Sequence, residues 1–382
     1  MRVLYVAPRY HTNQTEIMKG WLSRGDEICF LAHYAGKLED YSVVKPSVVG
    51  YSKLFLLIDY FYVHVIGRKK EYAVNMRLKC GFPPVLKLAR KMRDFKPDVV
   101  ITRERSVYSI FVTLICRIYG WPVILYNQSP ALEKEKEDFA HRIMRALTPT
   151  YRITPVYKSK RYELKDRIAD KTYFLPFLME PQVSPEEKQY FADDKINLFC
   201  IGKYQKRKNH KMMIQVVEKL ALKYPVRLII AGEASDSFQE AYYKSICEYV
   251  KEHHLEDRVK LYRDLTRAQV NEIYKKTDLF VLPSTDEPAA VSHLEAMAFS
   301  LAVISGDDNG TATYIENGRN GYIFKDQDAE DLYDKIELII QQRQNILKMG
   351  RESYEMVCKN HQFEGYCANI LRITEEIKKK QK

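Results

Sequence analysis

Short apolar runs of strand length alternate with helix-length segments through residues 196–305, and this alternation constrains the fold more than any other feature. The apolar runs lie at residues 196–201, 226–231, 258–262, 279–282 and 301–305. After the first run, Met213, Val217 and Leu220 recur at the spacing of one buried helix face. Strands that alternate with helices indicate a parallel sheet covered by helices on both faces. The sequence therefore predicts a doubly wound α/β domain in this half.

The first half of the chain shows the same alternation less regularly. Strands are expected at residues 2–7, 27–32, 98–102 and 122–126. A chain of 382 residues, 46% of them hydrophobic, is long enough for two cores. We expect an N-terminal domain at 1–180 and a C-terminal domain at 190–355, joined by a proline-punctuated linker. A final helix at about 360–382 is expected to pack back on the first domain.

The loops that follow the strands of the second half are the expected ligand site, because doubly wound sheets bind ligands beyond the carboxyl ends of their strands. These loops span residues 202–209, 232–236, 263–265, 283–290 and 306–311. The first begins with Gly202 and carries Lys203, Lys206, Arg207 and Lys208 before a helix. A glycine, several cations and a helix N-terminus suit a phosphate group. The alternative is a basic turn that is simply solvated.

Two glutamates flank the start of the helix expected at residues 291–299. Glu287 lies in the preceding loop, and Glu295 lies about one turn inside the helix, on a face that is otherwise apolar. Burying a carboxylate there is unfavourable unless it is hydrogen-bonded, and the vicinal hydroxyls of a ribose could satisfy it. The alternative is a carboxylate that pairs with a neighbouring lysine or caps a backbone turn.

The segment from residue 283 to 298 reads Pro-Ser-Thr-Asp-Glu-Pro-Ala-Ala-Val-Ser-His-Leu-Glu-Ala-Met-Ala. It resembles glycosyltransferase family four, in which two glutamates are separated by seven residues. Asn309-Gly310-Thr311 and Gly318-Arg319-Asn320-Gly321 continue the similarity, which covers residues 196–345. This resemblance implies a retaining glycosyltransferase of the GT-B fold, with two Rossmann-like doubly wound domains that face a central cleft.

The resemblance also implies roles for individual residues. Donor-binding positions would be Gly202, Lys203, Lys208, Arg263, Leu265, Glu287, Ala289, Ala290, Val291 and Glu295. Lys203 and Lys208 would neutralise the diphosphate and, with Glu287, form the catalytic set. Glu287 would contact hydroxyls of the transferred sugar, and Glu295 would bind the ribose. The amides of residues 289–291 would hold sugar and phosphate, and residues 262–265 would contact the base.

Charge development in the reaction favours a mechanism without metal. Two lysines and a helix N-terminus can stabilise the departing diphosphate, and one such preorganised donor contributes ~3 kcal/mol. The candidate for a metal motif is Asp326-Gln327-Asp328, directly before an expected helix at 329–342. Aspartates at that place are better explained as helix caps. We therefore expect no cofactor and no metal.

The acceptor side departs from the family pattern. Where many relatives have a histidine after a strand of the first domain, this chain reads Tyr126-Asn127-Gln128-Ser129. Asn127 or Gln128 could hydrogen-bond a sugar hydroxyl, but neither could act as a general base. In the donor loop, Pro288 and Ala290 stand where the family often has glycines.

The net charge of +11 points to an anionic partner. No nucleic-acid recognition element is evident, so nucleic acid is not expected. An anionic membrane surface fits better, because the apolar stretch 54–66 runs into Arg68-Lys69-Lys70 and the chain ends near Lys378-Lys379-Lys380. The alternative is a buried helix or strand flanked by solvated charge. Phosphate-bearing substrates would also account for the basic balance.

Seven scattered cysteines and the lack of a signal-peptide pattern predict a cytoplasmic protein, with peripheral contact at the inner face of the membrane left open. The expected activity is transfer of a sugar from a nucleotide-diphosphate sugar, UDP before GDP. The acceptor would be a glycan or a lipid-linked molecule in bacterial polysaccharide or envelope biosynthesis. The alternatives are a non-catalytic subunit that binds nucleotide sugar and a nucleotide-sugar epimerase of the same fold.

Overall fold

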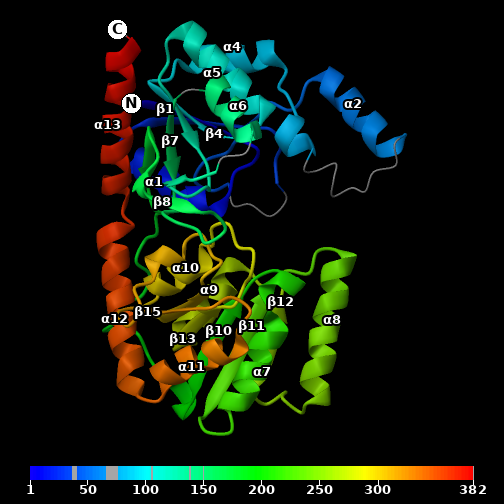
Figure 1. Ribbon diagram of the computed structural model, residues 1–382, viewed down its shortest axis with the longest axis vertical. Coiled ribbons are helices and arrows are strands. Elements are labelled where there is room, and N and C mark those ends of the chain that lie inside the picture. The colour runs from blue at the N-terminus through cyan, green and yellow to red at the C-terminus, as the bar shows by residue number, and fades with distance from the viewer. Residues whose placement is uncertain (37–40, 66–75, 105, 137–138, 149, 382) are drawn as a thin grey trace. The chain divides into compact units, whose positions relative to one another are not determined.

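The computed structural model describes residues 1–382 except 37–40, 66–75, 105, 137–138, 149 and 382 (Figure 1). The chain forms two compact units. Unit 1 comprises residues 1–155, 163–178 and 363–382, and unit 2 comprises 156–162 and 179–362. Each unit is a Rossmann-like α/β structure, so the predicted fold class is confirmed. The basic run at 68–70 lies outside the described residues.

The described part of unit 1 contains a parallel sheet of seven strands in the order β3-β2-β1-β4-β5-β7-β9. Its strands are β1 (Arg2–Ala7), β2 (Glu27–Ala32), β3 (Ser47–Val48), β4 (Val99–Arg103), β5 (Val123–Tyr126), β7 (Tyr151–Thr154) and β9 (Thr172–Phe174). An antiparallel pair is formed by β6 (Leu132–Lys134) and β8 (Leu164–Ile168). The central strands are buried along nearly their whole length, which explains why they read as continuous apolar runs.

The helices of unit 1 are α1 (Thr15–Ser23), α2 (Lys53–His64), α4 (Val85–Phe95), α5 (Val107–Tyr119), α6 (Phe139–Leu147) and α13 (Phe363–Gln381). Helix α5 begins at a capping box of Ser106 and Ser109 and ends at Gly120, whose φ of 68° places it in the left-handed region. Among the described residues, no helix combines the length and apolar character that crossing a bilayer requires.

The C-terminal helix α13 is part of the core of unit 1. The ring centroids of Phe363 and Trp21 are 5.1 Å apart, and the hydroxyl oxygen of Tyr366 lies 3.3 Å from that of Tyr5. Farther along, Ile370 and Ile373 are fully buried. Residues at the end of the chain therefore complete a core that begins with its first strand.

The described part of unit 2 contains a parallel sheet of six strands in the order β12-β11-β10-β13-β14-β15. Its strands are β10 (Ile196–Ile201), β11 (Val226–Gly232), β12 (Val259–Arg263), β13 (Leu279–Leu282), β14 (Ala302–Gly306) and β15 (Gly321–Phe324). Its helices are α7 (His210–Leu220), α8 (Ser237–Glu252), α9 (Arg267–Lys276), α10 (Ser292–Ala298), α11 (Ala329–Ile340) and α12 (Arg343–Asn360). The predicted strands agree to within one residue at each end, the usual uncertainty of a strand boundary.

Strand order reverses once in each unit. In unit 2 the reversal lies at β10, which pairs with β11 on one side and β13 on the other. In unit 1 it lies at β1, between β2 and β4. Loops diverge at such points, which is where open α/β sheets bind ligands. The loops after β10 and β13 therefore face the principal candidate crevice of unit 2.

The boundary of the units differs from the predicted one. Residues 156–162, expected in the N-terminal domain, group with unit 2. The reason is local: Lys160 pairs with Asp307, and Arg161 pairs with Asp308. Residues 356–362, beyond the predicted end of the C-terminal domain at 355, also belong to unit 2, because α12 continues to Asn360.

Candidate functional site

Gly202 follows β10 directly and makes room for a lysine. A Cβ atom at this position would lie 3.0 Å from both Cδ and Cε of Lys208, closer than side chains normally approach. The facing loop is equally tight, since a Cβ on Gly232 would lie 2.2 Å from the carbonyl oxygen of Gly202. Two glycines thus let the loops after β10 and β11 pack together while the Lys208 side chain crosses over the first of them.

Lys208 and Arg207 converge on one carboxylate oxygen of Glu287. Lys208 Nζ donates to Glu287 Oε2 at 2.6 Å, and Arg207 Nη1 donates to the same atom at 3.0 Å. The side chains of Lys208 and Glu287 are only 11% and 12% exposed. The cations lie on a short 3₁₀ turn, Lys206–Lys208, which ends at Asn209 with a φ of 51° before α7 begins. The loop after β10 is thereby joined to the loop after β13.

The electrostatics of this cluster keep Glu287 ionised. Burial raises the pKa of Glu287, but the charge and hydrogen bond of Lys208, with those of Arg207, outweigh burial, so its pKa is lowered. Two cations share a single carboxylate, which leaves one net positive charge in the cluster. An anion could therefore bind here without losing the pair that orients Glu287.

Asn309 binds the loop after β13 to the loop after β14. It is almost fully buried, and its Oδ1 accepts hydrogen bonds from the amides of Ala290 at 3.3 Å and Thr311 at 3.1 Å. The amide of Ala290 was expected to hold the donor. In the structure it donates a hydrogen bond to Asn309 instead. The neighbouring predicted positions, Ala289 and Val291, lie half-buried beside it.

The facing loop accommodates Pro288, which stands where a glycine was expected. A Cβ on Gly310 would lie 2.0 Å from the carbonyl oxygen of Pro288, so only glycine fits on that side. The amide of Gly310 donates to the carbonyl of Glu287 at 3.0 Å. The backbone of Gly310, in the loop after β14, thus lies close to the backbone of Pro288, in the loop after β13.

Glu295 lies in the first turn of α10, but it is not isolated in an apolar face. Its Oε1 pairs with Arg267 Nη2 at 2.5 Å, and its Oε2 accepts from the hydroxyl of the buried Tyr274 at 3.1 Å. The carboxylate of Glu295 is therefore paired with a neighbouring cation, which was the alternative interpretation. That cation is Arg267 rather than a lysine. A ribose at this position would have to share the carboxylate with Arg267.

The remaining predicted donor residues lie in separate contacts. Lys203 is exposed and pairs with Glu233 at 3.1 Å, and Arg263 pairs with Glu240 at 2.5 Å. Leu265 lies half-buried between β12 and α9. The structure thus brings Gly202, Lys208 and Glu287 into one cluster, while Lys203, Arg263 and Glu295 each have a partner of their own.

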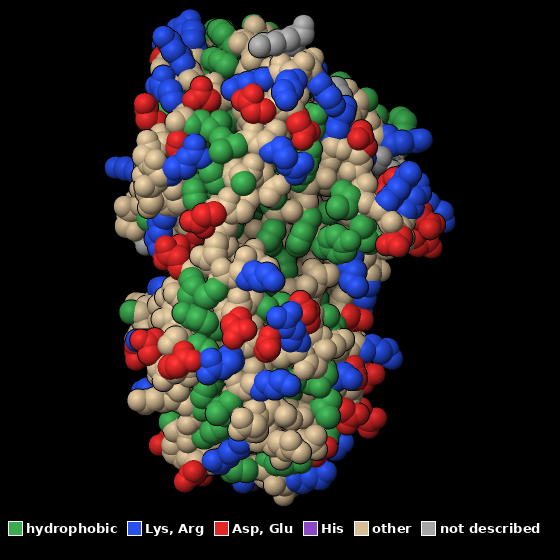
Figure 2. Space-filling model, turned by 90° about the vertical axis from the view of Figure 1, so that its left-hand side faces the viewer, with side chains coloured by type: hydrophobic (Ala, Val, Ile, Leu, Met, Phe, Trp, Pro, Cys, Tyr) green, Lys and Arg blue, Asp and Glu red, His purple; other side chains and the backbone are tan. Residues whose placement is uncertain are grey.

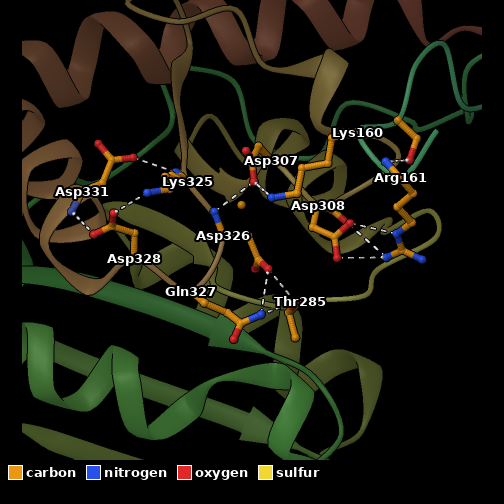
Figure 3. A network of polar contacts seen from close by, with 12 residues as sticks. Lys160, Arg161, Thr285, Asp307, Asp308, Lys325, Asp326, Gln327, Asp328 and Asp331 are labelled. Carbon is orange, nitrogen blue, oxygen red and sulfur yellow. Dashed lines mark hydrogen bonds and ion pairs between the residues drawn. The ribbon is translucent and has the colours of Figure 1, made fainter. Parts of the chain in front are cut away.

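A second network, not predicted from the sequence, supports the Glu287 loop from the other side (Figure 3). Arg161 donates from Nε to Asp308 Oδ1 at 2.8 Å and pairs through Nη1 with Asp286 at 2.7 Å. Asp308 Oδ2 accepts from the amide of Asp286 at 2.7 Å, and its carbonyl accepts from the amide of Glu287 at 3.3 Å. Lys160 contributes a further pair with Asp307. The guanidinium of Arg161 thus binds both Asp286, in the loop after β13, and Asp308, in the loop after β14.

The aspartates of the Asp-x-Asp motif have structural partners. Asp328 caps α11 by accepting from the amide of Asp331, as predicted, and Asp326 accepts from the hydroxyl of Thr285 at 2.6 Å (Figure 3). In the part of the chain that the structure describes, no group of three or more His, Cys, Asp or Glu side chains is placed to hold a metal ion.

Unit 1 has a cavity of about 200 Å³ at its own strand-order reversal. It is lined mainly by apolar side chains, and its polar lining includes His11, Arg103, Tyr126 and Gln128. Burial lowers the pKa of His11 to about 4, with a smaller effect from neighbouring arginines. The imidazole of His11 is therefore uncharged at neutral pH.

The two residues predicted on the acceptor side, Gln128 and Asn127, lie in different environments. Gln128 lines this cavity, and its Nε2 donates to the hydroxyl of Tyr126 at 3.2 Å. Asn127 instead donates to Glu104 at 2.5 Å and accepts from the amide of Ser129 at 2.9 Å. Glu104 also forms a buried ion pair with Arg152. Asn127 therefore completes an internal polar network, because a buried carboxylate between two strands needs donors.

Four residues of these clusters were not singled out from the sequence: Arg161, Arg207, Arg267 and Asn309. Arg207 stood within the basic run, but the run itself does not show which cations turn inward. Asn309 belonged to a quoted motif without a role. Arg161 and Arg267 carried no local signal, because the acids they bind are 147 and 28 residues away.

Comparison with known proteins finds similarity to one family within the second unit. Residues 184–356 match the family described as "Glycosyl transferases group 1". Spore coat protein SA of Bacillus subtilis is 26% identical over 233 residues, which cover 58% of this chain and 60% of that protein. The N,N'-diacetylbacillosaminyl-diphospho-undecaprenol alpha-1,3-N-acetylgalactosaminyltransferase of Campylobacter jejuni is 33% identical over 87 residues, 23% of each chain. The chain thus spans less than two thirds of these curated relatives.

Among solved structures, HepE of Anabaena in complex with UDP superposes with a TM-score of 0.72 at 14% identity. The alignment covers 98% of this chain and 100% of that one. At this identity the likeness concerns the fold, and it extends over both units.

Proposed function

We propose that the chain, whose residues 184–356 match the family described as "Glycosyl transferases group 1", is a retaining glycosyltransferase. In this proposal it moves a sugar from a nucleotide-diphosphate donor, UDP before GDP, to a glycan or lipid-linked acceptor. The pathway would be bacterial polysaccharide or envelope biosynthesis. The observation that carries the proposal is the Lys208–Glu287 pair over Gly202, at the strand-order reversal of unit 2.

The cluster suits the chemistry of donor cleavage. Breaking the bond between sugar and diphosphate builds negative charge on the leaving oxygen and positive character on the sugar ring. Lys208 and Arg207 would stabilise the first, since the N-terminus of α7 and its preceding cations form an anion site. The ionised Glu287 would accept hydrogen bonds from hydroxyls of the transferred sugar. Glu295, in the first turn of α10, would orient the ribose together with Arg267.

Support for the donor and acceptor classes comes from relatives. The Anabaena structure was solved with UDP, and the Campylobacter relative is named for action on a sugar linked to diphospho-undecaprenol. We propose that unit 1 binds the acceptor through its cavity, where Gln128 and Arg103 can hydrogen-bond hydroxyl or phosphate groups.

We further propose that unit 1 contacts an anionic membrane surface from the cytoplasmic side. It holds 33 of the 61 Lys and Arg residues but 20 of the 50 Asp and Glu residues, a net charge of +13. Unit 2, with 28 and 30, has a net charge of −2. Acidic and basic side chains are interspersed on the face of unit 2 drawn in the lower part of Figure 2. The basic excess of the chain therefore belongs wholly to unit 1.

The proposed chemistry needs no metal, because cationic side chains take the place of a divalent ion at the diphosphate. We expect turnover to be unchanged when the purified protein is assayed with EDTA in excess. A loss of activity that manganese restores would contradict the metal-free mechanism.

A panel of UDP-sugars and GDP-sugars screened by thermal shift tests the donor assignment, because a ligand raises stability with its occupancy. The same panel is then followed for release of the nucleotide diphosphate. Binding with release, accelerated by acceptor extracts, supports a transferase. Binding without release from any donor supports the non-catalytic subunit, and no binding at all contradicts the proposal.

A further inference from the structure

Helix α2 exposes an apolar face, whereas a helix surrounded by water usually exposes a polar one. Its one carboxylate, Asp59, is buried, while seven large apolar or aromatic side chains are between 48% and 65% exposed. These residues are Leu54, Leu56, Leu57, Ile58, Tyr60, Phe61 and Val65. A surface helix of a soluble protein normally shows the opposite pattern, with apolar residues inside and charge outside.

The inner face of α2 is held by a few specific contacts. Asp59 accepts from Arg77 Nε at 2.7 Å, and the ring of Phe55 packs against Tyr51 at 5.4 Å and Phe82 at 5.6 Å. Ser52 caps the helix by accepting from the amide of Phe55. Because these anchors fix one face, the outward direction of the apolar residues is built into the fold.

The outward residues form a continuous stripe. Leu54, Leu57, Ile58, Phe61 and Val65 stand at positions i, i+3, i+4, i+7 and i+11, the repeat of a single helix face. Figure 1 shows α2 at the periphery of unit 1. An exposed apolar stripe of this size marks a surface that another phase or molecule covers.

The charge around α2 identifies what covers it. Residues 51–65 and 76–96, which contain α2, its anchoring partners and α4, carry eight Lys and Arg against two Asp. One of those two, Asp59, is buried and bound to Arg77. Lys53 at the helix start and Lys79 beyond it are exposed. An apolar stripe that begins next to Lys53, within a segment and a unit of net positive charge, matches the interface of an anionic bilayer, where acyl chains meet negative headgroups.

We propose that α2 is the element that inserts into the membrane, lying in the interface plane with Leu57 and Phe61 at the centre of its buried face. The inference deepens the membrane contact of the proposed function and rests on it. Asp59 and Arg77 hold the helix to unit 1, so docking of the helix positions the whole unit at the surface.

The test uses the full chain and vesicles of phosphatidylcholine with about one third phosphatidylglycerol, measured by co-sedimentation. The double variant Leu57→Glu and Phe61→Glu should bind at least about tenfold more weakly than wild type. A matched control, Leu222→Glu with Phe238→Glu, alters two apolar residues of unit 2 that are even more exposed, and it should bind as wild type. Raising salt from about 0.05 to 0.5 M should weaken wild-type binding.

Each other outcome has a distinct meaning. If wild type ignores anionic vesicles, the membrane contact itself is wrong, and the donor assignment is untouched. Equal binding by wild type and the α2 variant would show that charge alone docks the protein, which overturns the assignment of α2. Equal binding to pure phosphatidylcholine would overturn the electrostatic part. A wild-type dimer that the α2 variant dissociates, seen by light scattering without vesicles, would make the stripe a contact between copies and overturn the proposal.

Discussion

At the scale of single residues, the candidate site depends on one lysine that is placed by a glycine. Lys208 is nearly buried, and its side chain passes close over Gly202 on its way to Glu287, where a Cβ atom would crowd it. Arg207 reaches the same oxygen from a more exposed position. The two cations therefore differ in how strongly their charge acts, since water screens the exposed one more.

We expect Lys208→Ala to lower turnover by on the order of a hundredfold or more, the usual effect of removing one preorganised donor from an anionic transition state. Arg207→Ala should have a smaller effect. Release of nucleotide diphosphate at saturating donor measures both, and circular dichroism checks the fold.

Lys223→Ala is the matched control, because Lys223 is also a lysine of unit 2 that pairs with a glutamate, Glu337 at 3.2 Å. It lies outside the loops after β10 and β13, so its turnover should equal that of wild type. Wild-type turnover in Lys208→Ala would remove the phosphate role from this residue.

At the scale of elements, the loop after β13 is held from two directions. Asn309 and Gly310 fix it to the loop after β14, and Arg161 fixes it to residues 156–162. The conformation needs such support, because Asp286 has a φ of 51°, which a residue with a side chain rarely adopts. Arg161 binds Asp286 and Asp308 together and so stabilises this turn next to Glu287.

We expect Arg161→Ala to lower the free energy of unfolding by about 1–3 kcal/mol, the contribution of hydrogen bonds to a charged group, and to lower turnover about tenfold. Arg161→Lys should recover only part of both, because lysine keeps the charge but cannot reproduce the guanidinium fork. Urea unfolding and steady-state kinetics measure the two effects.

Arg319→Ala provides the comparison, since Arg319 also makes two ion pairs, with Glu316 and Glu352, but at the exposed surface of unit 2. Its loss should lower the free energy of unfolding much less than Arg161→Ala does, because water screens exposed ion pairs, and it should leave turnover unchanged. If Arg161→Ala lowered stability without changing kcat, the residue would have no positioning role.

At the scale of the whole molecule, both units bury uncharged histidines. Burial lowers the pKa of His33 and of His210 to about 3, and that of His293 to about 4. Neither ring nitrogen of His210 has a hydrogen-bond partner among the described residues, and its ring packs against Tyr204. These histidines fold in the neutral form, so their protonation opposes folding.

Stability should therefore fall as pH is lowered from 7 to 5. Over this range the unfolded chain takes up protons near the ordinary value of 6.5, while the folded chain does not until about 4 or below, so the unfolded state gains. Each histidine contributes up to about 1.4 kcal/mol per pH unit.

Urea unfolding at pH 7, 6 and 5 measures this dependence. The variant His210→Phe keeps an aromatic ring of similar shape without a titrating group, so its stability should change less with pH than that of wild type. Equal stability at pH 7 and pH 5 would contradict the prediction, because it would mean that the buried histidines are protonated in the folded protein.

Much of the fold was predictable because the pattern of apolar residues is local. The strand β10 and the helix α7 follow from runs and repeats within a dozen residues, and the strand order then places their loops at one edge of the sheet. The spacing of Glu287 and Glu295 pointed to the correct helix, α10, for the same reason. Segment 36–93 was less predictable, since the exposed apolar face of α2 looks in sequence like a buried one.

What the sequence alone determined is the α/β class, the strand ends that carry the candidate site, and the basic and acidic residues available there. Only the tertiary structure decided which charges meet: Lys208 with Glu287 across 79 residues, Arg161 with Asp308 across 147, and Arg267 with Glu295. It also turned Asn127 inward and the apolar face of α2 outward. Periodicity is a property of neighbours along the chain, whereas an ion pair depends on the packing of all the elements that separate its two ends.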